Sequence, residues 1–168
     1  IAMGYLETAV VVYLRAIYYP NGFDFPLVNM NTSIAVTELG REAATIIMLA
    51  GIGIVAGKNP TQRFAWFLYC FAVWDIFYYI FLKVLLNWPE SLFTWDILFL
   101  IPLPWVGPVI APCIVSVSMI ALALMMVHCN DKNSYVKLIF KEWILLISGS
   151  VIVTLSFIIN CHIFIHSY

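Results

Sequence analysis

The feature that most constrains this chain is its set of long apolar runs, of which Thr45–Gly57, "TIIMLAGIGIVAG", is the clearest. Hydrophobic residues make up 64% of the sequence and charged residues 10%, whereas soluble domains average roughly half and a quarter. A helix that crosses a bilayer needs about 20 mostly apolar residues. The composition therefore predicts an all-α integral membrane protein, and 168 residues leave no room for a separate soluble domain.

The apolar runs and the turn-rich stretches between them predict about five transmembrane helices. Stretches rich in Pro, Gly, Asn and Ser, such as "PNGFDFPLVNMNTS" and "GKNP", mark loops. Gly53 and Gly57 in the second helix have the small-residue spacing that lets another helix approach closely. We expect a single polytopic membrane domain over residues 1–168, which begins with a mature helix because no basic flank or cleavage site of a signal peptide is seen. The predicted spans are residues 1–19, 34–57, 63–84, 105–128 and 142–164.

The region between the third and fourth predicted helices does not fit a simple span. Residues 91–101 are apolar enough to enter lipid but too short to cross it, and four prolines follow, at 102, 104, 108 and 112. Non-helical backbone persists at membrane depth only where protein or a water-filled cavity satisfies its hydrogen bonds. We therefore expect a proline-rich re-entrant or interfacial segment on the outer side, followed by a helix from Trp105 with prolines in its first two turns.

Cations are concentrated in the loops after the second and fourth predicted helices. Because cytoplasmic loops of membrane proteins are enriched in Lys and Arg, we expect these two loops in the cytoplasm and the C-terminus outside the cytoplasm. The region after the third helix has only Lys83. The cations of the two loops are Lys58, Arg63, Lys132, Lys137 and Lys141.

This orientation places charged residues from four separate segments in the outer half of the membrane. Such charges are costly unless they face the helix bundle, find a partner or become neutral. "TELGREAA" puts Glu38, Arg41 and Glu42 in the first turns of the second helix, close enough to interact. We expect Arg15, near the outer end of the first helix, to join them, and Asp96 belongs to the outer segment. The alternative is an ordinary charge cluster at the headgroups, favoured by the helix dipole.

Asp75 lies inside the third helix, about 12 Å from its outer end. Tyr78 and Tyr79 share its face, and we expect their hydroxyl groups to donate hydrogen bonds to its carboxylate. Asp75 is either a proton-handling or cation-binding group or a structural hydrogen-bond acceptor between helices. Glu7 lies about 12 Å along the first helix from Arg15, too far for direct pairing. A polar track from Glu7 past Asp75 to the outer charges would suit proton or ion passage.

Metal binding and enzymatic chemistry have little support in the sequence. His162 and His166, four residues apart in the fifth helix, could share a metal ion with an outer carboxylate, giving a site for zinc, iron or copper. Two histidines near the end of a span are more often interfacial polar residues. No phosphate-binding loop, HExxH or GxSxG sequence is present, so no motif supports a cofactor. A net charge of −1 without a basic patch argues against nucleic acid.

Three hypotheses for function follow from these patterns. The first is a site in the outer half of the bilayer that binds or translocates a small ion, proton or polar solute. The second is an accessory or structural subunit of a larger membrane complex, and the third a membrane enzyme acting on a lipid or quinone. Five helices leave little room for both packing and a wide channel, so we expect a homo-oligomer or partner subunits. The residues of the first hypothesis are Glu38, Arg41, Glu42, Asp75 and Asp96, supported by Arg15, Tyr78 and Tyr79.

Overall fold

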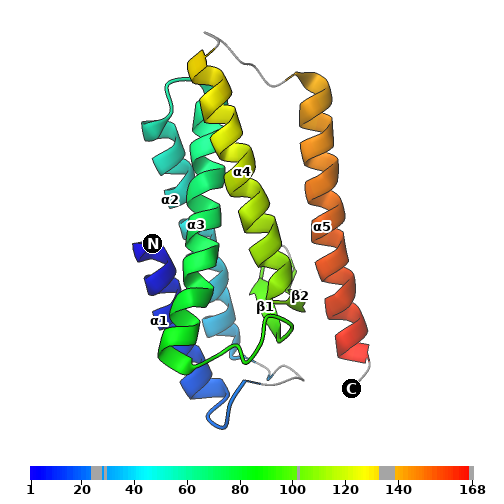
Figure 1. The fold of residues 1–168 in the computed structure, drawn as a ribbon. Helices are drawn as coiled ribbons and strands as arrows, with labels where there is room; N and C mark the ends of the chain where they lie inside the picture. Colours follow the sequence, from blue (N-terminus) through cyan, green and yellow to red (C-terminus); the bar gives the residue numbers. More distant parts are fainter. Residues whose placement is uncertain (24–27, 29, 102, 133–138, 167–168) are drawn as a thin grey trace.

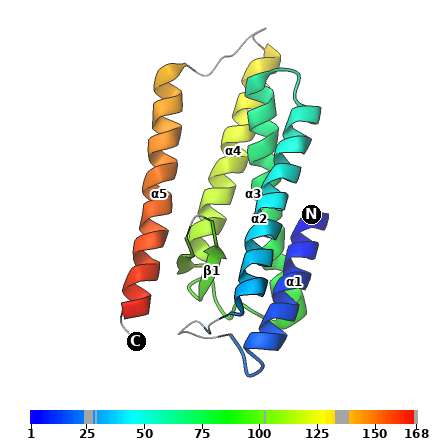
Figure 2. The ribbon, with the colours of Figure 1, turned by 180° about the vertical axis from the view of Figure 1, so that it is seen from behind.

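The chain forms a helical bundle with one small β-hairpin (Figures 1 and 2). In the computed structural model, residues 1–23, 28, 30–101, 103–132 and 139–166 are described, with the backbone alone for 130–132 and 160–166. The elements are α1 (Ala2–Tyr18), α2 (Thr32–Ala56), α3 (Pro60–Leu86), β1 (Trp95–Phe99), β2 (Trp105–Pro108), α4 (Ile110–Lys132) and α5 (Phe140–His166).

Four of the described helices, α2, α3, α4 and α5, are long and apolar enough to cross a membrane. This confirms the prediction of an apolar, helical protein of the membrane class. The count of about five spans stays a prediction, because α1 has 17 residues and a complete crossing needs about 20. Helices occupy all five of the predicted segments.

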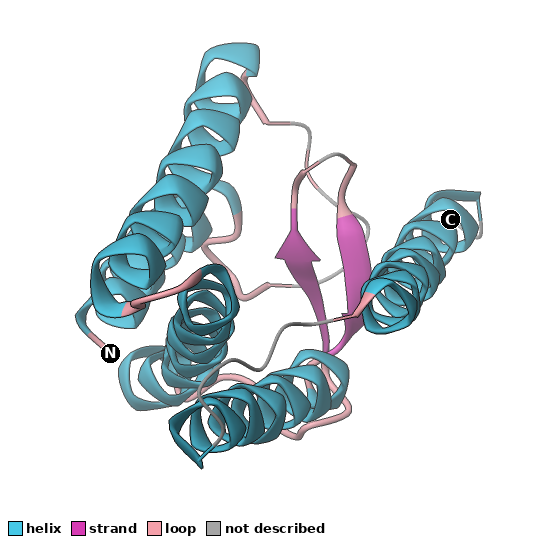
Figure 3. Ribbon diagram, turned by 90° about the horizontal axis from the view of Figure 1, so that it is seen from above, coloured by secondary structure: helices cyan, strands magenta, loops and turns pink. Residues whose placement is uncertain are grey.

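Helix α3 packs against α1, α2 and α4, and the two strands lie between the helices when the molecule is seen from above (Figure 3). Glycines make two of these contacts close. A Cβ atom added to Gly53 of α2 would lie 2.6 Å from the carbonyl oxygen of Arg63, and one added to Gly4 of α1 would lie 3.0 Å from that of Trp74. The Thr8 hydroxyl also donates to the Tyr78 carbonyl oxygen at 3.2 Å, which joins α1 to α3.

The half of the bundle nearer the α2–α3 turn is packed with apolar side chains. The first turns of α3 and the last turns of α4 share a buried cluster of Ala65, Leu68, Ala123 and Met126. Close packing of this kind leaves no room for water between the two helices. The buried charged side chains of the described residues, Glu38, Glu42 and Asp96, lie instead toward the opposite end, where α1 and the hairpin lie (Figure 1).

The region after α3 is an antiparallel hairpin, and here the predicted start of the fourth helix was wrong. Trp105–Pro108, which we expected in the first turns of that helix, form strand β2, and α4 begins at Ile110. The strands pair with Asp96 opposite Gly107 and Ile97 opposite Val106. Pairing satisfies backbone groups that prolines would leave open in a helix. Whether this hairpin is re-entrant or interfacial stays a prediction.

Helix α5 packs mainly against β2, and its Trp143 ring also lies 5.1 Å from that of Phe64 of α3. The ring of Phe157 stacks on Trp105 with centroids 6.1 Å apart, and a Cβ atom on Gly107 would lie 3.1 Å from Phe157. The C-terminal end of α5 and the hairpin lie at one end of the molecule, and the α2–α3 turn at the other (Figure 1). The assignment of these ends to the two sides of a membrane stays a prediction.

The Gly53 contact gives a direct test of the packing between α2 and α3. We expect Gly53→Ala to lower the free energy of unfolding by about 1–3 kcal/mol, because the added methyl group overlaps backbone that cannot move aside cheaply. Thermal unfolding in lipid nanodiscs measures this loss. Gly51→Ala is the matched control on the same helix, because an added Cβ there meets nothing within 4 Å. Equal stability of the two variants would contradict the packing.

Candidate functional site

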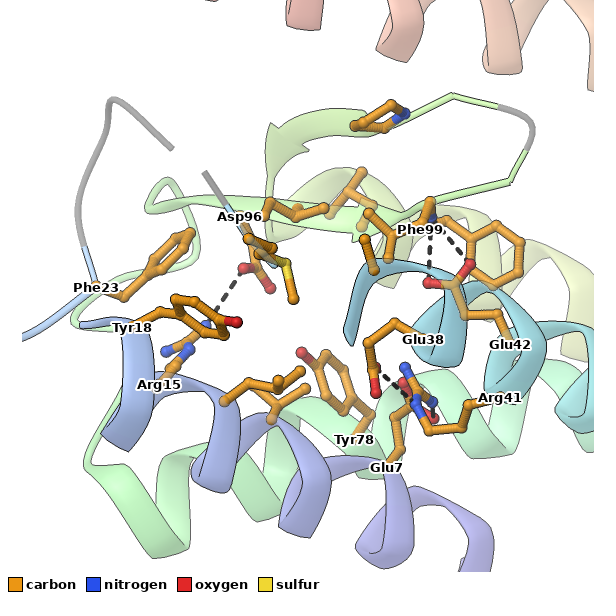
Figure 4. A pocket seen from close by; sticks show the side chains of 18 of the residues that line it. Glu7, Arg15, Tyr18, Phe23, Glu38, Arg41, Glu42, Tyr78, Asp96 and Phe99 are labelled. Atoms are coloured by element: carbon orange, nitrogen blue, oxygen red, sulfur yellow. Dashed lines mark hydrogen bonds and ion pairs between the residues drawn. The ribbon is translucent and has the colours of Figure 1, made fainter. Parts of the chain in front are cut away.

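A cavity of about 440 Å³ lies between α1, α2, α3 and the hairpin. Seven carboxyl and guanidinium groups from these parts of the chain line it, and all of them except Asp75 are labelled in Figure 4, where they surround a common space. The carboxyl groups of its wall are Glu7, Glu38, Glu42, Asp75 and Asp96, and the guanidinium groups are Arg15 and Arg41. Six of the seven belong to the predicted set, and the seventh, Glu7, is the residue that we had placed on a track leading to the site.

Arg41 joins two helices at one side of the cavity. Its Nε donates to Glu38 Oε2 at 2.8 Å, one turn earlier on α2. Its Nη1 donates to Glu7 Oε2 on α1. One guanidinium group thus serves two carboxylates, an arrangement that its planar set of N–H donors allows. The sequence did not identify Glu7 as the partner of Arg41, because the order in which the helices pack was unknown.

Arg15 joins α1 to the hairpin at the other side of the cavity. Its Nη2 donates to Asp96 Oδ1 at 3.3 Å, and 11% of the Arg15 side chain and 3% of the Asp96 side chain are exposed. The guanidinium also lies over two aromatic rings, 3.8 Å from the centroid of Trp88 and 4.5 Å from that of Phe23. Arg15 thus lines the same cavity as Glu38 and Glu42, and its ion-pair partner there is Asp96 of β1.

Asp96 is held by three kinds of contact. The Tyr79 hydroxyl donates to its Oδ2 at 3.4 Å, and the Ile97 N–H and the Arg15 charge also favour the ionised form. Burial nevertheless raises the pKa of Asp96 to about 6, because desolvation of the carboxylate is the largest effect and these contacts offset only part of it. Asp96 is therefore still mainly ionised at neutral pH and becomes protonated as the pH falls through about 6.

Glu42 and Asp75 are the two carboxylates of the cavity wall without an ion pair among the described residues. Both oxygens of Glu42 accept from the Leu100 N–H, at 3.1 and 3.0 Å, which ties α2 to the end of the hairpin. Asp75 Oδ2 accepts from the Ser116 hydroxyl of α4 at 2.7 Å. The expected hydrogen bonds from Tyr78 and Tyr79 to Asp75 are not formed. The Tyr79 hydroxyl donates to Asp96 instead, and the hydroxyl that donates to Asp75 is that of Ser116.

Most of the remaining wall is apolar and aromatic. Tyr78 lies between the Arg15–Asp96 pair and the Glu38–Arg41 pair (Figure 4). The Trp74 indole N–H is buried and has no hydrogen-bond partner within the described part of the chain. Cavities with apolar walls and a few convergent polar groups are typical of small-molecule sites. The aromatic side chains of the wall are Tyr18, Tyr19, Phe23, Trp74, Tyr78 and Phe99.

A shared metal ion finds no support in the cavity. Among the residues that the structure describes, no three His, Cys, Asp or Glu side chains are grouped closely enough to hold a metal ion. His162 and His166, the predicted metal ligands, lie in the α5 backbone, but their side chains are outside the described residues.

Comparison with known proteins adds no independent information on function. No protein-family model, no curated protein and no solved structure matches the chain.

The buried Arg15–Asp96 pair predicts a pH-dependent effect of its removal. We expect Arg15→Gln to lower the free energy of unfolding by about 3–5 kcal/mol at pH 8, because it leaves a buried charge without its partner. At pH 5 the loss should be smaller. Removal of Arg15 raises the pKa of Asp96 further above about 6, so the carboxyl group is then neutral. Thermal unfolding in nanodiscs at both pH values measures the difference.

The double variant Arg15→Gln/Asp96→Asn separates charge from packing. Because it removes both charges, it should recover much of the loss at pH 8. Glu90→Gln, at an exposed position before the hairpin, should have little effect at either pH. A loss that is the same at pH 5 and pH 8 and is unrelieved in the double variant would contradict the ion-pair account.

Proposed function

We propose that the chain is a membrane protein that binds a small, positively charged solute in the cavity between α1, α2, α3 and the hairpin. The observation that carries this proposal is the charge imbalance of the cavity wall, which has five carboxyl groups but only two guanidinium groups. Negative charge away from bulk water must be paired or neutralised. A cationic ligand supplies the missing charge.

The ion pairs within the cavity wall confine the surplus of negative charge to two carboxyl groups, those of Glu42 and Asp75. Arg41 is engaged by Glu7 and Glu38, and Arg15 by Asp96. Asp75 and Glu42 accept hydrogen bonds from uncharged donors, a hydroxyl and a backbone N–H. These two carboxylates are therefore the best places for an added positive charge.

The packing of the other half of the bundle favours binding from one side over an open channel. The cavity extends to Asp75, near the middle of α3, whereas the apolar Ala65–Leu68–Ala123–Met126 cluster closes the α3–α4 interface toward the α2–α3 turn. A permeating ion would need water or polar groups along that interface. We propose that the hairpin end of the molecule faces outside the cytoplasm, because the cations near the α2–α3 turn, Lys58 and Arg63, favour a cytoplasmic position for the opposite end.

A structural role is the second candidate, and one observation favours it. Two ion pairs, Arg41–Glu7 and Arg15–Asp96, and the Glu42 contact connect α1, α2 and the hairpin to one another. Buried ion pairs can fix the geometry of a fold without any ligand. Such a protein would serve as an accessory subunit of a larger complex, and its charges would be needed for assembly rather than for binding.

The charge of Asp75 separates the two candidates. We expect the wild-type protein in nanodiscs to be stabilised by at least one of four chloride salts, those of Na⁺, Ca²⁺, methylammonium and tryptammonium, with a saturable rise in Tm of about 5 °C. Each salt replaces N-methylglucamine chloride at constant ionic strength, which removes general salt effects. Asp75→Asn should fold but lose the rise, because it keeps the shape of the side chain and removes its charge.

Glu90→Gln serves as the control, because Glu90 is exposed and does not line the cavity. It should retain the full rise in Tm. A wild-type protein that responds to none of the four salts would overturn the proposed function and leave the structural role.

A further inference from the structure

The size and the walls of the cavity narrow the class of solute, and this inference rests on the proposed function. We infer that the ligand is an organic cation, a protonated amine carried on an apolar, aromatic-sized body, with its ammonium group at Asp75. Three observations lead to this class: the volume of the cavity, the chemistry of its wall, and a carboxylate oxygen of Asp75 that has no hydrogen-bond partner among the described residues.

The volume is far larger than an inorganic ion requires. A cavity of about 440 Å³ falls within the range of roughly 300–1,000 Å³ that is typical of sites for small organic molecules. An inorganic cation is instead surrounded closely by several oxygen ligands. No three acidic side chains in the described part of the chain meet around one point. An organic cation, whose ammonium group is attached to a larger apolar moiety, is therefore needed to fill the cavity.

The wall suits a body that is apolar and flat. Between its charged groups lie aliphatic side chains such as Val11, Leu14 and Leu39, together with six aromatic rings. Aromatic faces attract cations as well as apolar groups. The chain itself provides an example, because the Arg15 guanidinium lies over the rings of Trp88 and Phe23. An amine with an aromatic body combines both kinds of contact.

Asp75 is the carboxylate best placed to receive the ammonium group. Its Oδ2 accepts from Ser116, and its Oδ1 has no partner in the described residues. Its neighbours in the cavity wall, Trp74 and Tyr78, lie one residue before it and one turn after it on α3. Glu42 is less available, because the Leu100 N–H already bonds both of its oxygens.

Ala35 offers a way to test the size of the ligand separately from its charge. Ala35 is a small residue of α2 that lines the cavity, so Ala35→Phe fills part of the space and leaves every charge in place. Ala44 is exposed on the same helix, and Ala44→Phe is the matched control for an added ring outside the cavity.

The experiment is equilibrium dialysis of radiolabelled tryptamine against the protein in lipid nanodiscs, with empty nanodiscs subtracted. Tryptamine should bind saturably at one site per chain. Tryptophol, a neutral isostere with the same ring system, and methylammonium, a cation without a body, should each compete at least about 10-fold more weakly, since each lacks one of the two contacts. Equal competition by tryptophol would overturn the requirement for a cation.

The variants assign the two ends of the ligand. Asp75→Asn should weaken tryptamine binding by roughly 10- to 100-fold, as expected for loss of a charge-assisted hydrogen bond. Ala35→Phe should abolish it, while Ala44→Phe should bind as the wild type does. If Glu42→Gln abolished binding and Asp75→Asn did not, the assignment of the ammonium group to Asp75 would be wrong.

The inference and the proposed function can fail separately. If Na⁺ or Ca²⁺ stabilises the wild-type protein in an Asp75-dependent way but tryptamine does not bind, the organic-cation class is wrong and the proposed function stands. If neither the inorganic cations nor either ammonium salt has an effect, both the organic-cation inference and the proposed function are wrong.

Discussion

The Arg41 guanidinium, shared between Glu7 of α1 and Glu38 of α2, is the interaction on which the rest of the site depends. Lipid offers no partners for charged groups, so each must be satisfied within the protein. By neutralising two carboxylates, Arg41 holds the short α1 beside α2 and forms one side of the cavity. Without it, Glu7 and Glu38 would repel each other in surroundings of low dielectric constant.

The hairpin completes the cavity through contacts of the same kind. Its first strand offers Asp96 to Arg15, and its end offers the Leu100 N–H to Glu42. Strand β2 then supports α5 through Trp105 and Phe157. A short β-element thus connects the polar site to a helix that packs mainly against it. One hairpin therefore links the site to α5: strand β1 contributes to the site, and strand β2 contacts α5.

Much of the architecture could be predicted from the sequence, because apolar runs and breakers are local signals. Helices occupy all five predicted segments, and Gly53 makes a close contact of the kind its spacing predicts. The charged residues of the candidate site could also be identified from the sequence, because a charged residue within an apolar run stands out. Their pairing could not: Arg15 bonds Asp96 rather than the α2 cluster, and Asp75 bonds Ser116 rather than Tyr78 or Tyr79. Pairing depends on which helices are neighbours, and a single sequence does not contain that information. The hairpin was missed for a related reason, since pairing between residues 95–99 and 105–108 gives no periodic signal distinct from a proline-interrupted helix.

The central claim is that the surplus of carboxylates in the cavity is matched by a bound cation. The most direct measurement is native mass spectrometry of the full chain released from its own membranes in mild detergent. The account predicts one small cationic molecule per chain, retained by the wild type and absent from Asp75→Asn. Release of the chain with a reproducible set of protein partners and no bound cation would contradict it, and would assign the charged residues to assembly.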